Sequence, residues 1–480
     1  MNPFDLPAVA RREPQLAADP GLRRGWLSLG RPQARWLLAL AGAVTTVAAL
    51  ALGYDLHTHV GQTEPLSPAA AADSNLRDLG DAPPPNDASP GKRLVSPYEL
   101  LGREPRRSSS DEASLLEIFG LMASGRAEVA LPIAQRLVAE RPAFGLAQLV
   151  YADLLTAQTR SDGGFAAVPV ELTAPARERV AELTAEAQAR VQAAAFEPPA
   201  GSVPEPFLML DPAVKHAIAV DTGRSRVYVI ENSAQGPRLV REYYASIGKL
   251  GMLKQAEGDQ RTPLGVYFVT RALAPKRIAE RYGSRALVLN YPNPYDRVEG
   301  RTGDGIWLHG VSATDYVRPP WATDGCIALA NPQIEELAKF ISPQGTPILV
   351  AEHLDWVMPA ALAARQTEFM TTFERWRTAR DTDAAEALQG FYASGLTVPE
   401  VPAMGLPWRQ LLKDEQAHRR NGAARVIGSL SAVRWNDRRE LMVVTFSEGS
   451  SPTAIDQRMR RQYWVKEGGD WHIFYERLIG

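Results

Sequence analysis

The stretch that decides the fold reads WLHGVSATDYVRPPWATDGCIALANP and covers residues 307–332. It contains the single cysteine of the 480-residue chain, Cys326, seventeen positions after His309. A lone cysteine is commonly a small buried hydrophobe, whereas a cysteine within reach of a histidine base is a nucleophile. Gly310 and Gly325 adjoin the two side chains, and glycine lets backbone N–H groups approach a reacting carbonyl. The residues alone leave both interpretations open.

β-rich runs surround this stretch on both sides. Gly, Pro and Asn separate the runs VKHAIAV, RVYVIE, RLVREYYASI, PLGVYFVT, ALVLN, GIWLHG and TPILV. Between most of them there is no helix long enough for a crossover, so the sequence predicts a mainly antiparallel sheet or sandwich. The exception follows the cysteine directly, where Asn331 as N-cap and Pro332 at the first position predict a short helix.

Helical patterns fill the region from 109 to 200. Ser109 and Glu112 have the spacing of a capping box, and apolar residues then recur with helical spacing until a stop near Pro142. The pattern predicts a tetratricopeptide-like hairpin with a following helix. Its apolar stripes are expected to form a core rather than a binding face.

The C-terminal region, 366–480, begins with amphipathic helical patterns, one of them LLKDEQAHRRNGA. Alternating strands follow, in RVIGSLSAVRW, ELMVVTFSE, RQYWVKEGG and DWHIFYERLI. This order predicts an α+β unit that resembles the cone-shaped NTF2-like fold. No acid/base pair stands out there, so binding or scaffolding is the expected role.

An uncharged run, WLLALAGAVTTVAALALGY, occupies residues 36–54. Nineteen residues at ~1.5 Å each nearly cover the ~30 Å apolar core of a bilayer. Residues 1–35 hold six arginines against three acids, which favours a cytoplasmic N-terminus. The sequence therefore predicts a single-pass anchor in the inner membrane with the remainder in the periplasm; a cleaved signal peptide is the alternative. Residues 55–108, rich in Pro, Ala, Ser, Asp and Gly, are expected to be a disordered linker.

Composition narrows the functional classes. A formal charge of −2 gives no reason to propose nucleic acid as a partner. One cysteine excludes an internal disulfide and any zinc site that needs several thiolates. No glycine-rich phosphate loop follows a strand and opens a helix.

The block around Cys326 resembles the L,D-transpeptidase (YkuD-type) family, whose signature is a histidine followed some fifteen residues later by Ser/Thr-His-Gly-Cys. The upstream GDQRTPLGVYFV, residues 258–269, is similar to the family's Thr-Pro-x-Gly-x-Tyr/Phe segment. The resemblance covers residues 211–352. It implies a β-sandwich-like catalytic domain that acts on peptidoglycan stem peptides without a metal or organic cofactor.

The resemblance also assigns roles by position. Cys326 is expected to be the nucleophile and His309 the base. The carbonyl of Gly310 would orient the imidazole, and N–H groups around Asp324, Gly325 and Cys326 would form the oxyanion hole.

The sequence departs from the family pattern at two positions. Asp324 replaces the usual histidine before Gly-Cys, and Ala328 replaces the usual Arg or Asn. A carboxylate beside a thiol opposes its ionisation, so Asp324 is expected to accept loop N–H groups or to pair with Arg318. Arg318 is either the substitute cation for a substrate carboxylate or an ordinary solvated arginine. Tyr267 would point toward substrate if the family's strand register holds.

The resemblance implies a cysteine enzyme of cell wall biogenesis and cell shape, which forms a thioester with a stem peptide and passes it to an amine in a 3–3 cross-link. The same acyl-enzyme could serve a peptidase, an amidase or an enzyme that attaches envelope proteins. A non-catalytic envelope scaffold, with protein partners on the helical and C-terminal regions, is a further alternative.

Overall fold

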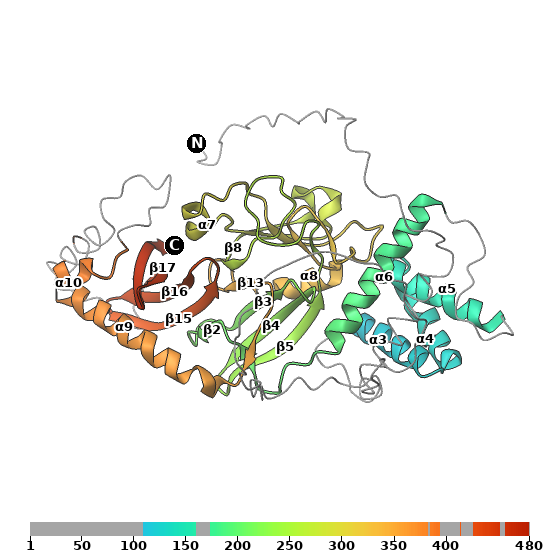
Figure 1. Cartoon of the computed structure of the whole chain (residues 1–480), viewed down its shortest axis with the longest axis horizontal. Coiled ribbons are helices and arrows are strands. Elements are labelled where there is room, and N and C mark those ends of the chain that lie inside the picture. Colours follow the sequence, from blue (N-terminus) through green and yellow to red (C-terminus); the bar gives the residue numbers. More distant parts are fainter. Residues whose placement is uncertain are drawn as a thin grey trace, which may run out of the picture.

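The computed structural model describes residues 109–159, 173–382, 385–393, 413, 426–451 and 457–479. A helical part comes first, a β-rich part second, and a long helix with four long strands last. The β-rich part lies between the other two (Figure 1). The predicted tail (1–35), membrane span (36–54) and linker (55–108) lie outside the described residues. No helix in the described ranges is long and apolar enough to cross a bilayer.

Helices form the first part, as the sequence patterns predict. The side chain of Ser109 caps the first helix by accepting the N–H of Glu112 at 3.3 Å. The carboxylate of Glu112 does not complete the expected capping box; it binds the buried Arg190 and Arg226. The apolar stripes pack into one buried cluster. The helices are α3 (Ser110–Ala123), α4 (Ala127–Glu140), α5 (Gly145–Thr159) and α6 (Ala174–Ala194).

Two sheets face each other in the β-rich part. One has the order β5-β4-β3-β13-β7 and the other the order β12-β10-β9-β8. Side chains from both, such as Val220 and Leu308, share one buried cluster. The five-stranded sheet consists of β3 (His216–Asp221), β4 (Arg226–Ser233), β5 (Gly236–Tyr244), β7 (Gly265–Tyr267) and β13 (Ile348–Ala351). The second contains β8 (Val269–Leu273), β9 (Ala286–Leu289), β10 (Trp307–His309) and β12 (Ile327–Ala328).

Most neighbouring strands are antiparallel, which confirms the predicted sandwich. Three pairs are parallel: β3 with β13, β10 with β12, and the short pair of β6 with β11 described next. Smaller elements complete this part: β6 (Ile247–Gly248) pairs with β11 (Trp321–Thr323), and α7 (Pro294–Val298) and α8 (Asn331–Ala338) are short helices. Helix α8 follows the cysteine strand as predicted, but its N-cap is Ala330 rather than Asn331.

The C-terminal part is an antiparallel sheet with a helix on one face. The four predicted strands are confirmed as β15 (Val426–Asn436), β16 (Glu440–Gly449), β17 (Arg458–Glu467) and β18 (Asp470–Ile479). Helices α9 (Ala363–Asp381) and α10 (Ala385–Gln389) precede them. Apolar side chains of α9 pack on one face of the sheet, and the other face packs against β3 and β4. Most of the predicted LLKDEQAHRRNGA helix lies outside the described residues.

Two short strands cross the predicted domain boundaries. Strand β2 (Phe207–Met209) precedes the predicted catalytic region 211–352, yet it pairs with β15 at the edge of the C-terminal sheet. Strand β1 (Val203–Pro204) pairs with β14 (Trp356–Val357). Residues 203–209, between the helical and β-rich parts, therefore connect the C-terminal part to the β-rich part through strand pairing.

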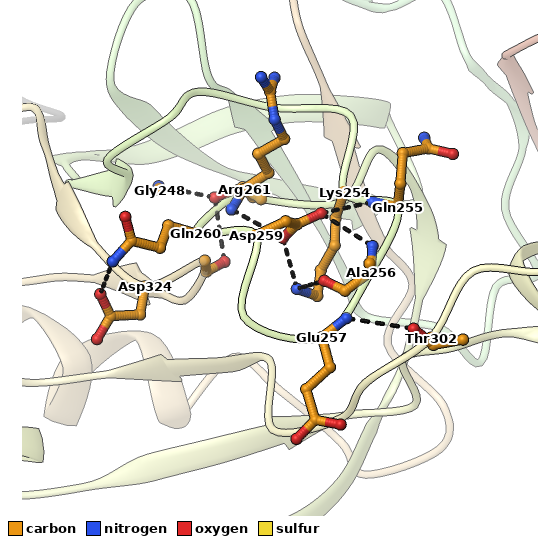
Figure 2. Close-up of polar contacts among 12 residues, drawn as sticks. Gly248, Lys254, Gln255, Ala256, Glu257, Asp259, Gln260, Arg261, Thr302 and Asp324 are labelled. Carbon is orange, nitrogen blue, oxygen red and sulfur yellow. Dashed lines mark hydrogen bonds and ion pairs between the residues drawn. The ribbon is translucent and has the colours of Figure 1, made fainter. Parts of the chain in front are cut away.

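The loop between β6 and β7 is organised by Asp259 (Figure 2). Its carboxylate accepts the backbone N–H groups of Gln255 at 2.6 Å, Ala256 at 3.0 Å and Arg261 at 3.1 Å. It also accepts the buried ammonium of Lys254 at 2.7 Å. Burial raises the pKa of Asp259, but these hydrogen bonds outweigh it and lower the pKa to about 2.

We expect Asp259→Asn to destabilise the fold by about 3 kcal/mol, because it leaves the Lys254 ammonium buried without its counter-charge. Thermal or urea unfolding measures this loss. The folded pKa of about 2 lies below the ~3.9 of an unfolded aspartate. The contribution of Asp259 is therefore fully present above about pH 4 and is lost as the pH falls through 2.

The matched control is Glu257→Gln, the same carboxylate-to-amide change at an exposed position of this loop. It should leave the free energy of unfolding within about 0.5 kcal/mol of the wild type. Equal effects of the two substitutions at neutral pH would contradict the role given to Asp259.

Candidate active site

The loop before Cys326 is held by two threonine hydroxyls. Thr323 accepts the N–H of Gly325 at 3.1 Å and donates to the carbonyl of Cys326 at 2.7 Å. Thr262 donates to the carbonyl of Gly325 at 3.1 Å. Gly325 has φ +117°, and a Cβ there would lie 2.6 Å from the carbonyl oxygen of Arg261. Only glycine can occupy that position. This glycine and the two threonine hydroxyls together fix the conformation of the loop that places Cys326 directly before β12.

His309 ends β10, where its imidazole is buried. Its Nδ1 lies 2.5 Å from the carbonyl oxygen of Gly310, so the contact that the sequence predicts is present. This geometry assigns the proton to Nδ1, since a carbonyl can only accept, and leaves the Nε2 lone pair free to take a proton. The edge-on ring of Tyr282, with centroids 5.0 Å apart, holds the other side of the imidazole.

Parallel pairing brings the cysteine and the histidine together. Across β10 and β12, Leu308 lies opposite Ile327 and His309 opposite Ala328. Paired side chains of parallel strands point to the same face, and the faces alternate along each strand. Cys326 precedes Ala328 by two residues, so its thiol lies on the same face as the imidazole. Only the methyl group of Ala328 stands directly opposite the histidine.

The thiol of Cys326 is half-buried and donates a hydrogen bond to the carbonyl of Gly305, 3.3 Å from Sγ. Among the hydrogen bonds of the described residues, none joins this thiol to His309. Catalytic hydrogen bonds are often long or misaligned without substrate. Transfer of the proton to Nε2 therefore requires the thiol to leave Gly305.

Electrostatics keep both groups neutral at rest. Burial raises the pKa of Cys326 to about 11, although the backbone N–H of Trp307 and the charge of Arg318 favour the thiolate. Burial lowers the pKa of His309 to about 4, against the hydrogen bond to Gly310, which raises it, and with a smaller contribution from the positive charges of Arg318 and Arg281. At neutral pH the pair is a thiol and a neutral imidazole, not a thiolate–imidazolium ion pair.

The predicted oxyanion hole needs a correction. The N–H of Gly325 is already taken by Thr323 and cannot also bind an oxyanion in this state. Among the described hydrogen bonds, none uses the N–H groups of Asp324 or Cys326. These two donors, beside the reacting sulfur, remain in place for a developing negative charge.

Asp324 has partners that the sequence analysis did not predict. Its exposed carboxylate binds Lys249 at 3.1 Å and Gln260 at 3.2 Å, and Figure 2 shows the contact with Gln260. It pairs neither with Arg318 nor with a loop N–H in the described hydrogen bonds, so both expectations are wrong. The Asp324 carboxylate also raises the pKa of Cys326, but burial, the backbone N–H of Trp307 and the charge of Arg318 have larger effects on it.

Two arginines lie beside the catalytic pair. The guanidinium of Arg318 donates to the carbonyl of Arg281 at 2.9 Å. Arg281 is exposed, contacts the hydroxyl of Tyr282 at 3.2 Å, and its pKa is raised first by that contact and also by Asp324 and Cys326. Because both cations influence His309 and Cys326, the site is electropositive where an anionic substrate would arrive.

Tyr267 is a core residue, which corrects the predicted contact with substrate. Its side chain is fully buried in the sandwich core. The hydroxyl lies 3.0 Å from both the carbonyl of Leu264 and the carboxylate of Asp296. Arg301 pairs with the same carboxylate, so Tyr267 supports a buried polar cluster rather than a binding surface.

Three positioning residues escaped the sequence analysis: Thr262, Asn331 and Tyr282. Asn331 is the clearest, because its Oδ1 accepts the N–H groups of Ser284 at 3.0 Å and Val311 at 3.2 Å. Its Nδ2 also donates to the carbonyl of Val311 at 2.8 Å. A Cβ on Gly310 would lie 2.1 Å from its Oδ1. Thr262 lies in the Thr-Pro segment noted in the sequence, but nothing there indicated its contact with Gly325, 63 positions away. The contact of Asn331 with Ser284 spans 47 positions and likewise left no pattern in the sequence.

A family model described as "YkuD: L,D-transpeptidase catalytic domain" matches residues 215–350. The protein named "Putative L,D-transpeptidase YafK" of Escherichia coli (strain K12) is 36% identical over 90 residues. That stretch is 18% of this chain and 31% of the relative, so the match spans less than a third of the relative's length.

Two solved structures are similar over larger shares. The structure of Bdellovibrio bacteriovorus Bd1075 is 26% identical and covers 58% of this chain and 98% of its own, with a TM-score of 0.47. The helical cell shape determining protein Pgp2 from Campylobacter jejuni is 20% identical and covers 55% and 91%, with a TM-score of 0.42.

In the described residues, no three His, Cys, Asp or Glu side chains gather to hold a metal ion. The family match includes both parallel strands of the site, with His309 at the end of β10 and Cys326 immediately before β12. Residues 215–350 are therefore a YkuD-type L,D-transpeptidase catalytic domain.

Proposed function

We propose that the chain is a cysteine-dependent L,D-transpeptidase that acts on peptidoglycan stem peptides through a thioester. The observation that carries this proposal is the placement of Cys326 and His309 on one face of two parallel strands, with the imidazole fixed by Gly310. Nucleophile, base and orienting group are the parts that acyl transfer requires.

The first half of the reaction forms the acyl-enzyme. Sγ of Cys326 attacks the carbonyl carbon of the third stem residue while Nε2 of His309 takes the thiol proton. The N–H groups of Asp324 and Cys326 bind the resulting oxyanion. The intermediate collapses, the amide C–N bond breaks, and the departing D-alanine amine receives the proton from Nε2.

The second half transfers the acyl group. An amine of a neighbouring stem attacks the thioester carbonyl and gives a proton to Nε2 of His309. The C–S bond breaks, and the sulfur takes this proton from Nε2 of His309, which restores the thiol and the neutral imidazole. With a stem amine as acceptor the product is a 3–3 cross-link; water would give a peptidase and a protein lysine an attachment enzyme.

The charge of the site fits a donor of this kind. A stem peptide is anionic, and Arg318 and Arg281 lie beside the catalytic pair. The family's usual cation two places after the cysteine is absent, and the buried Ala328 has no room for one. We infer that Arg318 receives a substrate carboxylate in its place.

The remaining regions would deliver this site to the cell wall. The apolar run 36–54 would anchor the chain in the inner membrane, with the catalytic domain in the periplasm. The helical part and the C-terminal part, which we propose is NTF2-like, would contact envelope proteins. The C-terminal sheet with α9 on one face is compatible with that fold.

Incubation of the full-length protein with purified sacculi tests the reaction. We expect mass spectrometry of muropeptides to show 3–3 cross-linked species and loss of the terminal D-alanine from tetrapeptides. Cys326→Ala should abolish both changes, because it removes the nucleophile. Tripeptides without cross-links would identify water as the acceptor. If the muropeptides stay unchanged although Cys326 of the same protein still reacts with iodoacetamide, the stem-peptide substrate is contradicted.

The resting state predicts a specific pH dependence of alkylation. With the pKa of Cys326 at about 11, the thiolate fraction rises with pH, so the rate with iodoacetamide should increase about tenfold per pH unit from 7 to 10. The single cysteine makes mass spectrometry of the adduct unambiguous. A rate that stays constant from about pH 5 upward would show a thiolate–imidazolium pair and contradict the neutral one.

Arg318→Ala should lower kcat/KM for a tetrapeptide donor about tenfold, because a charge-assisted hydrogen bond contributes about 1.5–3 kcal/mol. The control is Arg271→Ala, an exposed arginine on β8. Alkylation of Cys326 by uncharged iodoacetamide should fall much less than kcat/KM, because Arg318 acts on the pKa of the thiol only after burial and the N–H of Trp307. A parallel loss in both assays would mean that Arg318 shapes the loop instead of binding the carboxylate.

A further inference from the structure

The connection from His309 to the cysteine strand, residues 311–320, has no regular secondary structure. It carries Arg318, and two of its other residues, Tyr316 and Val317, are buried. They lie in the same apolar cluster as the helices of the N-terminal part. The loop that links base and nucleophile is therefore packed against a part of the chain outside the catalytic domain.

Tyr316 makes three contacts with the helical part. Its hydroxyl donates to a carboxylate oxygen of Asp111 at 2.7 Å. Its ring stacks on Phe144 with centroids 4.2 Å apart and planes at 24°. Its backbone N–H donates to the carbonyl of Ala143 at 3.1 Å. Backbone, ring and hydroxyl are all engaged, so the position of Tyr316 is set by the helices.

The partners of Tyr316 are themselves fixed. Asp111, in the first turn of α3, also accepts Nε of Arg141 at 2.7 Å, which joins α3 to the end of α4. The adjacent Glu112 pairs with Arg226 of β4 at 2.8 Å inside the protein. This buried pair holds α3 against the catalytic sheet, since separating it would leave an uncompensated charge.

A second contact fixes the loop two residues later. The hydroxyl of Tyr244, at the end of β5, donates to the carbonyl of Arg318 at 3.1 Å. The guanidinium of Arg190 in α6 lies over the Tyr244 ring, 4.0 Å from its centroid. Arg190 of α6 thus contacts Tyr244, which in turn binds the backbone of Arg318. Asp111 of α3 contacts Tyr316, two residues before Arg318.

We propose that the helical part completes the substrate-binding side of the active site, with Asp111 and Tyr316 as positioning residues that place Arg318 for the anionic donor. This inference rests on the proposed function, because it gives Arg318 a substrate carboxylate. His309 ends β10, and Cys326 directly precedes β12 in a loop held by Thr323 and Thr262, so this pair is positioned without these contacts. The contacts should therefore govern recognition of the donor and leave the reactivity of the thiol unchanged.

Tyr316→Phe is the sharpest test, since it removes the hydroxyl and keeps the ring on Phe144. In the full-length protein we expect KM for a tetrapeptide with a free carboxylate to rise about fivefold, with kcat changed less than twofold. Asp111→Asn should act in the same direction. Iodoacetamide should alkylate Cys326 at the wild-type rate. The matched control is Tyr151→Phe, a partly buried tyrosine of α5 outside this loop contact.

A double-mutant cycle with Arg318→Ala separates positioning from general destabilisation. If Tyr316 acts through Arg318, Tyr316→Phe should raise KM no further once Arg318 is alanine. Independent effects that multiply in the double variant would overturn the proposal. So would a fall in kcat and in alkylation rate together, which would show damage to the catalytic pair.

Hydrogen exchange distinguishes failure of this inference from failure of the proposed function. Tyr316→Phe should speed amide exchange in a peptide that covers residues 311–320, whatever the enzyme's substrate. Unchanged exchange would overturn the positioning role even if sacculi are cross-linked. Faster exchange, without turnover of tetrapeptide by the wild type, would retain the contact between helices and loop and reject the stem-peptide substrate.

Discussion

The parallel pairing of β10 with β12 is the constraint on which the site depends. Cys326 and His309 lie seventeen positions apart and make no direct hydrogen bond in the described structure. They share one face only because Leu308 pairs with Ile327 and His309 with Ala328. A shift of one residue in this register would send the thiol to the opposite face of the sheet. The hydroxyls of Thr323 and Thr262 hold the loop that sets this register.

Parallel neighbours require a long connection, and here much of that connection is irregular. Within residues 311–320 the described backbone hydrogen bonds are limited to Asp315 N–H with the carbonyl of Ser312 at 3.0 Å, whereas a crossover helix would be bonded along its length. The support of these residues comes from Asn331 at the beginning and from Tyr316 against the helical part. The need to stabilise this crossover gives a physical reason for a helical region next to a small catalytic sandwich.

Burial decides the chemistry of the resting site. The same environment that raises the pKa of Cys326 lowers that of His309, because both charged forms lose hydration. With these pKa values the resting site holds a neutral thiol, and in the reaction that we propose the proton moves to the imidazole as the carbonyl is attacked. Arg318 and Arg281 oppose an imidazolium but favour the negative charge that develops on the sulfur and the oxyanion. The site is thus suited to a charge that exists only during the reaction.

The sequence by itself determined the local elements and pointed to the candidate reacting groups. Strand alternation and the Ser109 cap are dictated by neighbours along the chain, so they were predictable. The glycines at 310 and 325 were visible in the sequence, but the contacts with Asn331 and Arg261 that require them are tertiary. The pairing of a single cysteine with a histidine was readable from the family-like motif. The tertiary structure alone decided which polar groups meet. Asp324 finds Lys249 and Gln260, Tyr267 is buried on Asp296, and Tyr316 reaches Asp111 across 205 positions. Such contacts depend on how sheets and helices pack, and no periodicity of the chain encodes them.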